Sequence, residues 1–431
     1  MSQAKSFVVE TSPSELRERY LATRAFTARL CESLEAEDCV IQSMPDVSPT
    51  RWHLAHTTWF FEEFALGRFA DERPFHPAFK YLFNSYYNAV GAQFPRSERG
   101  MLSRPTVAEV WAYRDDVDRR LAGRLAESDD AQLAYIVELG IQHEQQHQEL
   151  ILTDIKHVLS RNPLFPVYRE APARDDDSPG SMRPPAAEWL EHDEAIYEIG
   201  HTGPGFAYDN ESPRHRVLLE DFMIASRPVN CGEYLQFMAD DGYRRAELWL
   251  SAGWQTVQQE GWQAPLYWHE RPEGWSQFTL AGLRPLDPAE PVCHVSYFEA
   301  DAFARWAGAR LPTEAEWEVA SAAVSSEQGN FADTLLAAGA ALHPAAPPTE
   351  DVGAVRMFGD VWQWTASPYT AYPGYAPPDG ALGEYNGKFM CNQFVLRGGS
   401  CATSSNHIRA TYRNFFPPEA RWQFCGFRLA R

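Results

Sequence analysis

The chain has no long apolar run, few basic residues and few cysteines. A helix that crosses a bilayer needs about 18 or more consecutive apolar residues, and none of the 431 residues belongs to such a run. The chain has 38 Lys and Arg against 59 Asp and Glu, which gives a formal net charge of −21. Nucleic acids and anionic membranes bind clustered basic side chains. We therefore expect neither a nucleic acid nor a membrane as a partner.

Cysteine usage and the N-terminal segment bear on the cellular compartment. The seven cysteines are an odd number at irregular spacings, which is not the pattern of a disulfide framework. Residues 1–20 lack the basic and apolar regions of a secretory signal peptide. Both observations indicate a cytoplasmic protein.

A chain of this length favours two domains, and its first part has helical periodicity. Apolar residues recur at intervals of three and four in four segments, each of which predicts an amphipathic helix: 12–34, 46–66, 106–125 and 129–160. Ser12 before Pro13 and Ser48 before Pro49 are typical of helix starts. Four helices of this length predict an up-and-down bundle over residues 1–168.

The remaining chain has a different composition. Residues 169–186 combine Pro, Gly and an acidic triplet without periodicity, which predicts a linker. Residues 187–431 contain short β-like runs, many Gly and Pro, dense Trp and Tyr, and one strong helical pattern over 296–321. This part predicts an α+β domain with much irregular structure. The expected fold class is therefore a multidomain α and α+β protein.

His143 and His147, in the string HEQQH, are four residues apart on a predicted helix. Helical spacing places them on one face with Cβ atoms about 5–6 Å apart, which suits one metal ion bound by both imidazoles. The string also matches the HExxH pattern of zinc proteases, in which Glu144 would be the general base. No third ligand follows at the spacing of that class, which disfavours the protease interpretation. Two polar surface histidines without a metal are the alternative.

A third ligand is available upstream, in the string RWHLAH. His56 lies within the apolar stripe of the second predicted helix, whereas His53 lies nearer its edge. Facing helices of a bundle can place ligands in a shared core site, and the geometric choice is then His56, His143 and His147. Three neutral imidazoles suit Zn, Fe, Cu or Ni, so these residues leave the metal open.

Motifs along the whole chain resemble those of one enzyme family. In order, they are MPDVSPTRWHLAHTTWFFEEF, FNSYYNAVG, LSRPTVAEV, HEQQHQELILTDIKHVL and HIRATYRNFFPPEARWQFCGFRLAR. The strings RLPTEAEWEVA, GDVWQWTASPY and VLRGGSCAT add to the likeness. Together they resemble the ergothioneine-biosynthesis sulfoxide synthases. The resemblance implies a DinB-like four-helix bundle, followed by a C-type-lectin-like domain of the formylglycine-generating-enzyme (sulfatase-modifying) kind.

The resemblance also implies a chemistry for the three histidines. They would hold a mononuclear non-haem Fe(II) centre, with ligands at His56, His143 and His147 and with O2 as the oxidant. The family joins the sulfur of cysteine or γ-glutamylcysteine to imidazole C2 of hercynine, which is Nα-trimethylhistidine, and the product is a sulfoxide. His53 is then left with a supporting or structural role.

Four further positions match residues that bind hercynine in the family. The resemblance implies that Gln146 and Asn414 hydrogen-bond this substrate, Gln146 at the imidazole beside the iron. A trimethylammonium group cannot donate a hydrogen bond and is bound by aromatic faces, which Phe415 and Phe416 are placed to supply. Plain core packing is the alternative for these two phenylalanines.

The pair Tyr86 and Tyr87 matches tyrosines near the iron in the branch that this sequence most resembles. The resemblance implies that one of them, Tyr87 before Tyr86, supplies a proton during the reaction, as a phenol with a pKa near 10 can do. In another branch the tyrosine comes from the second domain. A structural role at an interface is the alternative for both residues.

Arg96 and Arg99 match positions that hold the carboxylate of the sulfur donor, for which a bidentate guanidinium is suited. The segment AQFPRSERG departs from the family at Phe94, where a His is expected, and at residues 97–98, which are Ser and Glu. This departure leaves the donor open. The alternative is a selenoneine synthase, which joins a selenosugar to hercynine.

Two other classes of protein stay open at this point. One is a zinc DinB-type thiol transferase that uses the same three histidines and needs no O2. The other is a non-catalytic binding module built on the lectin-like domain. Cys391 and Cys401 resemble the copper-binding pair of formylglycine-generating enzymes, but we expect them to be buried small residues without a catalytic role.

Overall fold

The computed structural model describes residues 12–171, 186–347 and 353–431. These residues divide into two compact units. The first unit comprises the described residues up to Arg161, together with Thr202–Ala207 and Pro378–Tyr385, and the second unit comprises the rest. The linker expected over 169–186 lies, from residue 172 to residue 185, outside the described residues. The domain boundaries expected at residues 168 and 187 stay predictions.

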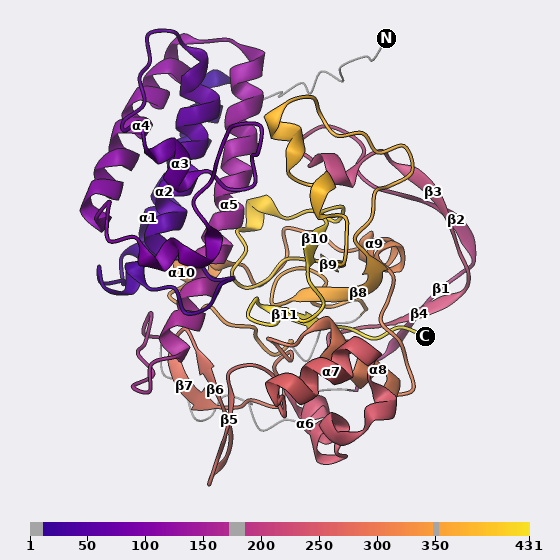
Figure 1. Cartoon of the computed structure of the whole chain (residues 1–431). Helices are drawn as coiled ribbons and strands as arrows, with labels where there is room; N and C mark the ends of the chain where they lie inside the picture. The colour runs from indigo at the N-terminus through magenta and orange to yellow at the C-terminus, as the bar shows by residue number, and fades with distance from the viewer. Residues whose placement is uncertain (1–11, 172–185, 348–352) are drawn as a thin grey trace. The chain divides into compact units, whose positions relative to one another are not determined.

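Long helices form the first unit (Figure 1). They are α1 (Pro13–Cys31), α2 (Thr50–Phe60), α4 (Val107–Glu127) and α5 (Ala131–Ser160), with the short helix α3 (Phe79–Phe83) between α2 and α4 along the chain. Both α1 and α2 pack against α4 and α5. The four-helix bundle expected from the sequence is confirmed.

Three of the four long helices, α1, α4 and α5, start at a residue whose side chain caps them, and α2 is the exception. Ser12 caps α1 through its side chain, and Thr106 caps α4 in a capping box. Ser48 does not cap α2, because Pro49 occupies the capping position. The Ser48 hydroxyl instead accepts a hydrogen bond from Arg99 Nη1 at 2.9 Å. The proline still marks the start of α2, but the serine is used elsewhere.

The contact between α2 and α5 depends on a glycine. Beyond Phe60, the chain continues into a π-helical turn over Phe61–Ala65, and the buried ring of Phe61 meets α5 at Gly140. A Cβ atom on residue 140 would lie 2.3 Å from Phe61 Cε1. Gly140 therefore lets the π-helical turn that continues α2 approach α5 closely.

The second unit combines short helices with small sheets (Figure 1). Its helices are α6 (Cys231–Ala239), α7 (Ser251–Glu260), α8 (Tyr297–Trp306), α9 (Glu314–Ser321) and α10 (Ala332–Ala337). Two of its sheets are antiparallel pairs: β1 (Trp189–His192) with β4 (Phe222–Ala225), and β2 (Ala195–Ile199) with β3 (His215–Leu219). A third sheet is a meander of β5 (Trp268–Arg271), β6 (Gly274–Thr279) and β7 (Gly282–Pro285). A further sheet has the order β10 (Asn414–Phe416), β9 (Phe394–Arg397), β8 (Trp362–Pro368), β11 (Cys425–Phe427), with β11 parallel to β8.

The single helix expected over 296–321 is wrong. The helix α8 ends at Trp306, and Gly308 has a φ of 65° in the left-handed region. Pro312 precedes the capping residue of α9, Thr313. A left-handed Gly ends a helix and a Pro cannot continue one, so the pattern is split into α8 and α9. The helices α6, α7 and α10 also lie where the sequence showed no strong helical pattern.

Aromatic side chains fill the core of the second unit. Trp317, Trp362 and Trp364 are buried in one cluster with residues of α6, α8 and β11. The α+β character expected for this part is confirmed. Within the described residues, no helix is both long and apolar enough to cross a membrane.

Candidate metal centre

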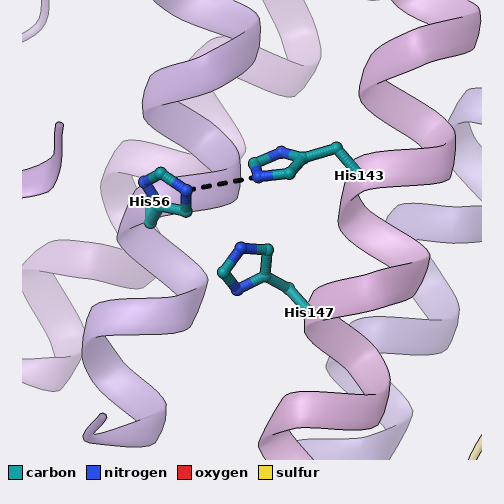
Figure 2. Close-up of side chains that lie close together, drawn as sticks. All are labelled: His56, His143 and His147. Atoms are coloured by element: carbon teal, nitrogen blue, oxygen red, sulfur yellow. Dashed lines mark hydrogen bonds between the residues drawn. The ribbon is translucent and has the colours of Figure 1, made fainter. Parts of the chain in front are cut away.

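Three histidines on α2 and α5 converge in the core of the first unit. His56 comes from α2, and His143 and His147 come from successive turns of α5 (Figure 2). One ring nitrogen of each histidine lies within 4.8 Å of those of the other two, and all three residues are buried. His56 Nε2 lies 3.2 Å from His143 Nε2.

This spacing fits a single metal ion. Two nitrogen atoms that are each about 2.1 Å from one ion lie about 3.0 Å apart at a right angle and about 3.4 Å apart in a tetrahedron. Burial lowers the pKa of His143 to about 4, and burial together with the neighbouring histidines lowers the pKa of His56 and of His147 well below the ordinary value. Neutral imidazole is the form that binds a metal, so the three residues fit a nitrogen-ligated ion.

The ring of His56 is held by a hydrogen bond at one nitrogen and by stacked aromatic rings. Its Nδ1 hydrogen-bonds the carbonyl oxygen of Phe83, which leaves Nε2 for the site. Trp52 stacks on the same ring with a centroid distance of 4.5 Å, and Trp59 lies nearly parallel to it at 5.6 Å. Such supporting contacts orient metal ligands.

His53 and Asp154 lie behind His147. His53 Nδ1 is 2.8 Å from His147 Nδ1, and His53 Nε2 is 3.0 Å from Asp154 Oδ2. His53 was expected to have a supporting or structural role, whereas Asp154 was not predicted from the sequence. Its position seven residues after His147, on the same face of α5, is the signal that could have indicated it.

Glu144 lies between His143 and His147 in sequence but is held by other partners. Its carboxylate accepts hydrogen bonds from Arg24 and Arg114, each at 2.8 Å, and from the hydroxyl of Thr27 at 2.6 Å. Burial opposes its ionisation, but Arg114 and Arg24 lower the pKa of Glu144 to about 2. A carboxylate held in this way ties α5 to α1 and α4 and is unsuited to act as the base of a zinc protease.

Tyr87 is buried near the histidines, among aromatic rings. Its ring lies 5.9 Å from that of Trp59 and 6.2 Å from that of Phe60. The centroid of the Trp59 ring lies 5.6 Å from that of His56, and the centroid of the Phe60 ring lies 4.7 Å from that of His143. Burial raises the pKa of Tyr87, so its phenol keeps its proton.

Tyr86 has a strained backbone and contacts Arg96. Its φ of 68° is in the left-handed region, where a bulky residue is rare. Its hydroxyl accepts a hydrogen bond from Arg96 Nη1 at 2.7 Å. The centroid of its ring lies 6.2 Å from that of the Tyr385 ring. The Glu384 carboxylate accepts a hydrogen bond from the backbone amide of Ala89 at 3.0 Å. The segment Pro378–Tyr385 thus packs on the loop that carries the two tyrosines.

Arg99 is a buried cation, whereas Arg96 is exposed. Its guanidinium donates to the hydroxyls of Ser48 and Ser85, each at 2.9 Å. Among the described residues, no carboxylate lies within ion-pair distance of Arg99. Burial lowers the pKa of Arg99 to about 9. A buried guanidinium held only by neutral groups is suited to bind an anion.

The remaining predicted residues lie on two elements. Gln146 is half-buried on α5, directly before His147. Asn414, Phe415 and Phe416 form β10 of the second unit and are half-buried. The Phe415 ring stacks on Tyr369 with a centroid distance of 4.0 Å. β10 therefore presents partly accessible aromatic side chains rather than a closed core.

The seven cysteines all lie within the described residues, and none of them forms a disulfide there. Cys401 is buried, but Cys391 is exposed, so the expectation that both are buried is wrong for Cys391. This residue follows a short 3-10 turn, Gly387–Phe389, in the loop before β9, and loops run over the surface of a protein.

Two family models match the chain. The DinB superfamily matches residues 19–151, and the sulfatase-modifying factor enzyme 1-like domain matches residues 192–431. These matches confirm the expected order of a DinB-like bundle followed by a C-type-lectin-like domain of the formylglycine-generating-enzyme kind.

Curated relatives are similar over the whole chain. The hercynine oxygenase of Mycobacterium tuberculosis is 32% identical, over 97% of this chain and 99% of that protein. The hercynine oxygenase of Mycolicibacterium thermoresistibile is also 32% identical, over 97% of this chain and 94% of that protein. The ergothioneine biosynthesis protein 1 of Schizosaccharomyces pombe is 29% identical, over 52% of this chain and 28% of that protein.

Proposed function

Since the chain belongs to the ergothioneine-biosynthesis sulfoxide synthase family, we propose that it is a cytoplasmic, iron-dependent oxidoreductase that acts on hercynine. The reaction joins the sulfur of cysteine or γ-glutamylcysteine to imidazole C2 and gives a sulfoxide. O2 is the oxidant: one oxygen atom enters the sulfoxide, and the other leaves as water with the C–H and S–H hydrogens.

The observation that carries the proposal is the cluster of His56, His143 and His147. These three buried imidazoles have nitrogens at distances suited to one ion. Three nitrogen donors suit Fe(II) as well as Zn(II), and the likeness to hercynine oxygenases favours iron. Bound at this site, Fe(II) would supply the activation of O2.

Arg99 is the residue that we assign to the carboxylate of the sulfur donor. It is buried, it has no carboxylate partner among the described residues, and it lies over Trp52, whose ring stacks on His56. A donor carboxylate would neutralise this cation close to the metal. Arg96, which is exposed and bonded to Tyr86, would assist it.

Hercynine is assigned to Gln146 on α5 and to three residues of β10. Gln146 and Asn414 carry amide groups that can hydrogen-bond an imidazole or a carboxylate. Phe415 and Phe416 can offer ring faces to the trimethylammonium group, which is stabilised by about 0.5–2 kcal/mol per ring. Both residues are half-buried, so part of each side chain is accessible.

Tyr87 is assigned as the proton donor, with Tyr86 as the second choice. The buried phenol of Tyr87 contacts the rings that pack on His56 and His143, and its raised pKa keeps the proton in place until a strong base forms nearby. Tyr86 is already engaged with Arg96.

The selenosugar remains the second candidate for the donor because the segment around Phe94 departs from the family. A selenosugar has no carboxylate, so the buried guanidinium of Arg99 favours the thiol donors. The protein loaded with Fe(II) is therefore supplied with hercynine, O2 and one donor at a time: cysteine, γ-glutamylcysteine or a selenosugar. Mass spectrometry should find a sulfoxide from one of the two thiols. A product from the selenosugar alone would overturn the sulfur version.

The zinc transferase makes a different prediction for the same assay. It would join the thiol to its acceptor without O2 and with Zn(II) in the site. The proposed enzyme should give no product without O2 or with Zn(II) in place of Fe(II). Full turnover under either condition would overturn the proposal.

A further inference from the structure

A chain of hydrogen bonds runs from the proposed ligand His147 through α2 and back to α5. His147 Nδ1 lies 2.8 Å from His53 Nδ1, and His53 Nε2 lies 3.0 Å from Asp154 Oδ2. The amide of Ser48 donates to the same carboxylate oxygen at 2.8 Å. The relative exposures of His147, His53 and Asp154 are 8%, 2% and 3%. The three side chains therefore find their hydrogen-bond partners in one another rather than in bulk water.

The positions of the protons follow from what each group can accept. A carboxylate without a proton only accepts hydrogen bonds, and the tautomer of His53 that donates to Asp154 from Nε2 has a lone pair on Nδ1. That lone pair accepts from His147. His147 must donate from its own Nδ1, and its lone pair is therefore on Nε2. That is the atom a metal requires.

We propose that His53 and Asp154 are positioning residues for His147. They keep the proton of His147 on Nδ1 and present the Nε2 lone pair to the ion. The inference rests on the metal site of the proposed function, and it does not depend on the identity of the sulfur or selenium donor.

The three ligands differ in this support. His56 has a backbone partner, the carbonyl oxygen of Phe83. His143 Nδ1 is buried without a hydrogen-bond partner among the described residues. His147 alone of the three is held by a side chain that a carboxylate fixes in turn. His53 and Asp154 are thus the positions where a substitution can alter the ligand set without removing a ligand.

Two substitutions of His53 separate positioning from packing. His53→Phe keeps a buried ring but removes both hydrogen bonds. His53→Gln is the matched control, because its amide can accept from His147 and donate to Asp154. The probe is Co(II), titrated into the metal-free full-length protein by calorimetry. We expect His53→Phe to weaken Co(II) binding by about 10–100-fold and His53→Gln to weaken it by less than about threefold.

The results distinguish the inference from the proposed site. If the wild type binds Co(II) and His53→Phe binds it equally well, the positioning role is overturned while the metal site stands. If the wild type does not bind Co(II), or if His147→Ala binds it like the wild type, the metal site itself is overturned.

A measurement on the wild type alone guards against an unfolded variant. Nitrogen-15 NMR of the metal-free protein reports which ring nitrogen of each histidine carries the proton. We expect the proton of His147 on Nδ1 and that of His53 on Nε2. A proton on His147 Nε2 would overturn the inference whatever the variants do.

Discussion

The guanidinium carbon of Arg99 lies 3.4 Å from the centre of the Trp52 ring. The same ring stacks on His56 with a centroid distance of 4.5 Å. A buried positive charge is therefore one aromatic ring away from a proposed metal ligand. Because no described carboxylate lies within ion-pair distance of this guanidinium, an anionic substrate group is its natural partner.

This relationship predicts different effects for the two arginines that we assign to the sulfur donor. Arg99→Gln should raise the KM for the thiol donor by about 10–100-fold, because a hydrogen bond to a charged group contributes about 1.5–3 kcal/mol. Arg96→Gln should raise it by about fivefold or less, since an exposed charge contributes about 1 kcal/mol at most. Steady-state kinetics at saturating hercynine measure both values. Equal effects of the two substitutions would count against the assignment of Arg99.

A second prediction concerns Glu144, which is fully buried between Arg24 and Arg114. Glu144→Gln should lower the free energy of unfolding by about 3–5 kcal/mol, since it leaves two buried cations without their carboxylate. Glu63→Gln is the control, because Glu63 pairs with Lys80 at the surface. This substitution should lower the free energy of unfolding by less than about 1 kcal/mol. Urea unfolding of the metal-free protein measures both. An unchanged stability of Glu144→Gln would contradict the structural role given to this residue.

A third prediction compares two helical glycines. Gly140→Ala should destabilise the protein by about 1–3 kcal/mol, because the new methyl group would meet the Phe61 ring. Gly123→Ala on α4 meets no atom within 4 Å and should stabilise it by up to about 1 kcal/mol. Thermal unfolding of the two variants should shift the midpoint in opposite directions. A midpoint that rises for Gly140→Ala would show that the Phe61 ring does not lie against α5 at Gly140.

The pH dependence of stability should involve Glu314 in the second unit. Burial disfavours its charge, but Arg413 at 2.8 Å and Arg397 at 3.1 Å lower the pKa of Glu314 below its ordinary value of 4.5. A carboxyl group with a lowered pKa stabilises the fold above the pKa of the unfolded state. This contribution is lost as the pH falls through the lower folded value.

Glu314→Gln tests this dependence. The wild type should be more stable than Glu314→Gln at pH 7, and the difference in the free energy of unfolding should shrink at about pH 3. Chemical unfolding at both pH values gives the difference. A difference that is independent of pH would mean that Glu314 contributes through packing and not through its charge.

The sequence was sufficient for features that depend on local patterns. The spacing of His143 and His147 predicted a shared face, and the apolar stripe around Trp52 and Trp59 favoured His56 over His53. The structure brings His56, His143 and His147 together, although their role as ligands stays a proposal. The prediction worked because helical periodicity fixes which side chains face the interior.

Features that depend on distant partners were missed. Nothing in the local pattern pairs His53 with Asp154, which are 101 residues apart. Nor does it assign Pro378–Tyr385 to the helical unit. The exposed position of Cys391 also depends on which elements cover its loop. Such contacts are set by tertiary packing, which periodicity and capping signals do not predict.

The origin of the sulfoxide oxygen tests the central claim most directly. The Fe(II)-loaded protein is given hercynine and its thiol donor under 18O2, and the mass of the product is measured. We expect one 18O atom in the sulfoxide, and no product when O2 is absent. A sulfoxide without the label, or a carbon–sulfur product that forms without O2, would contradict it.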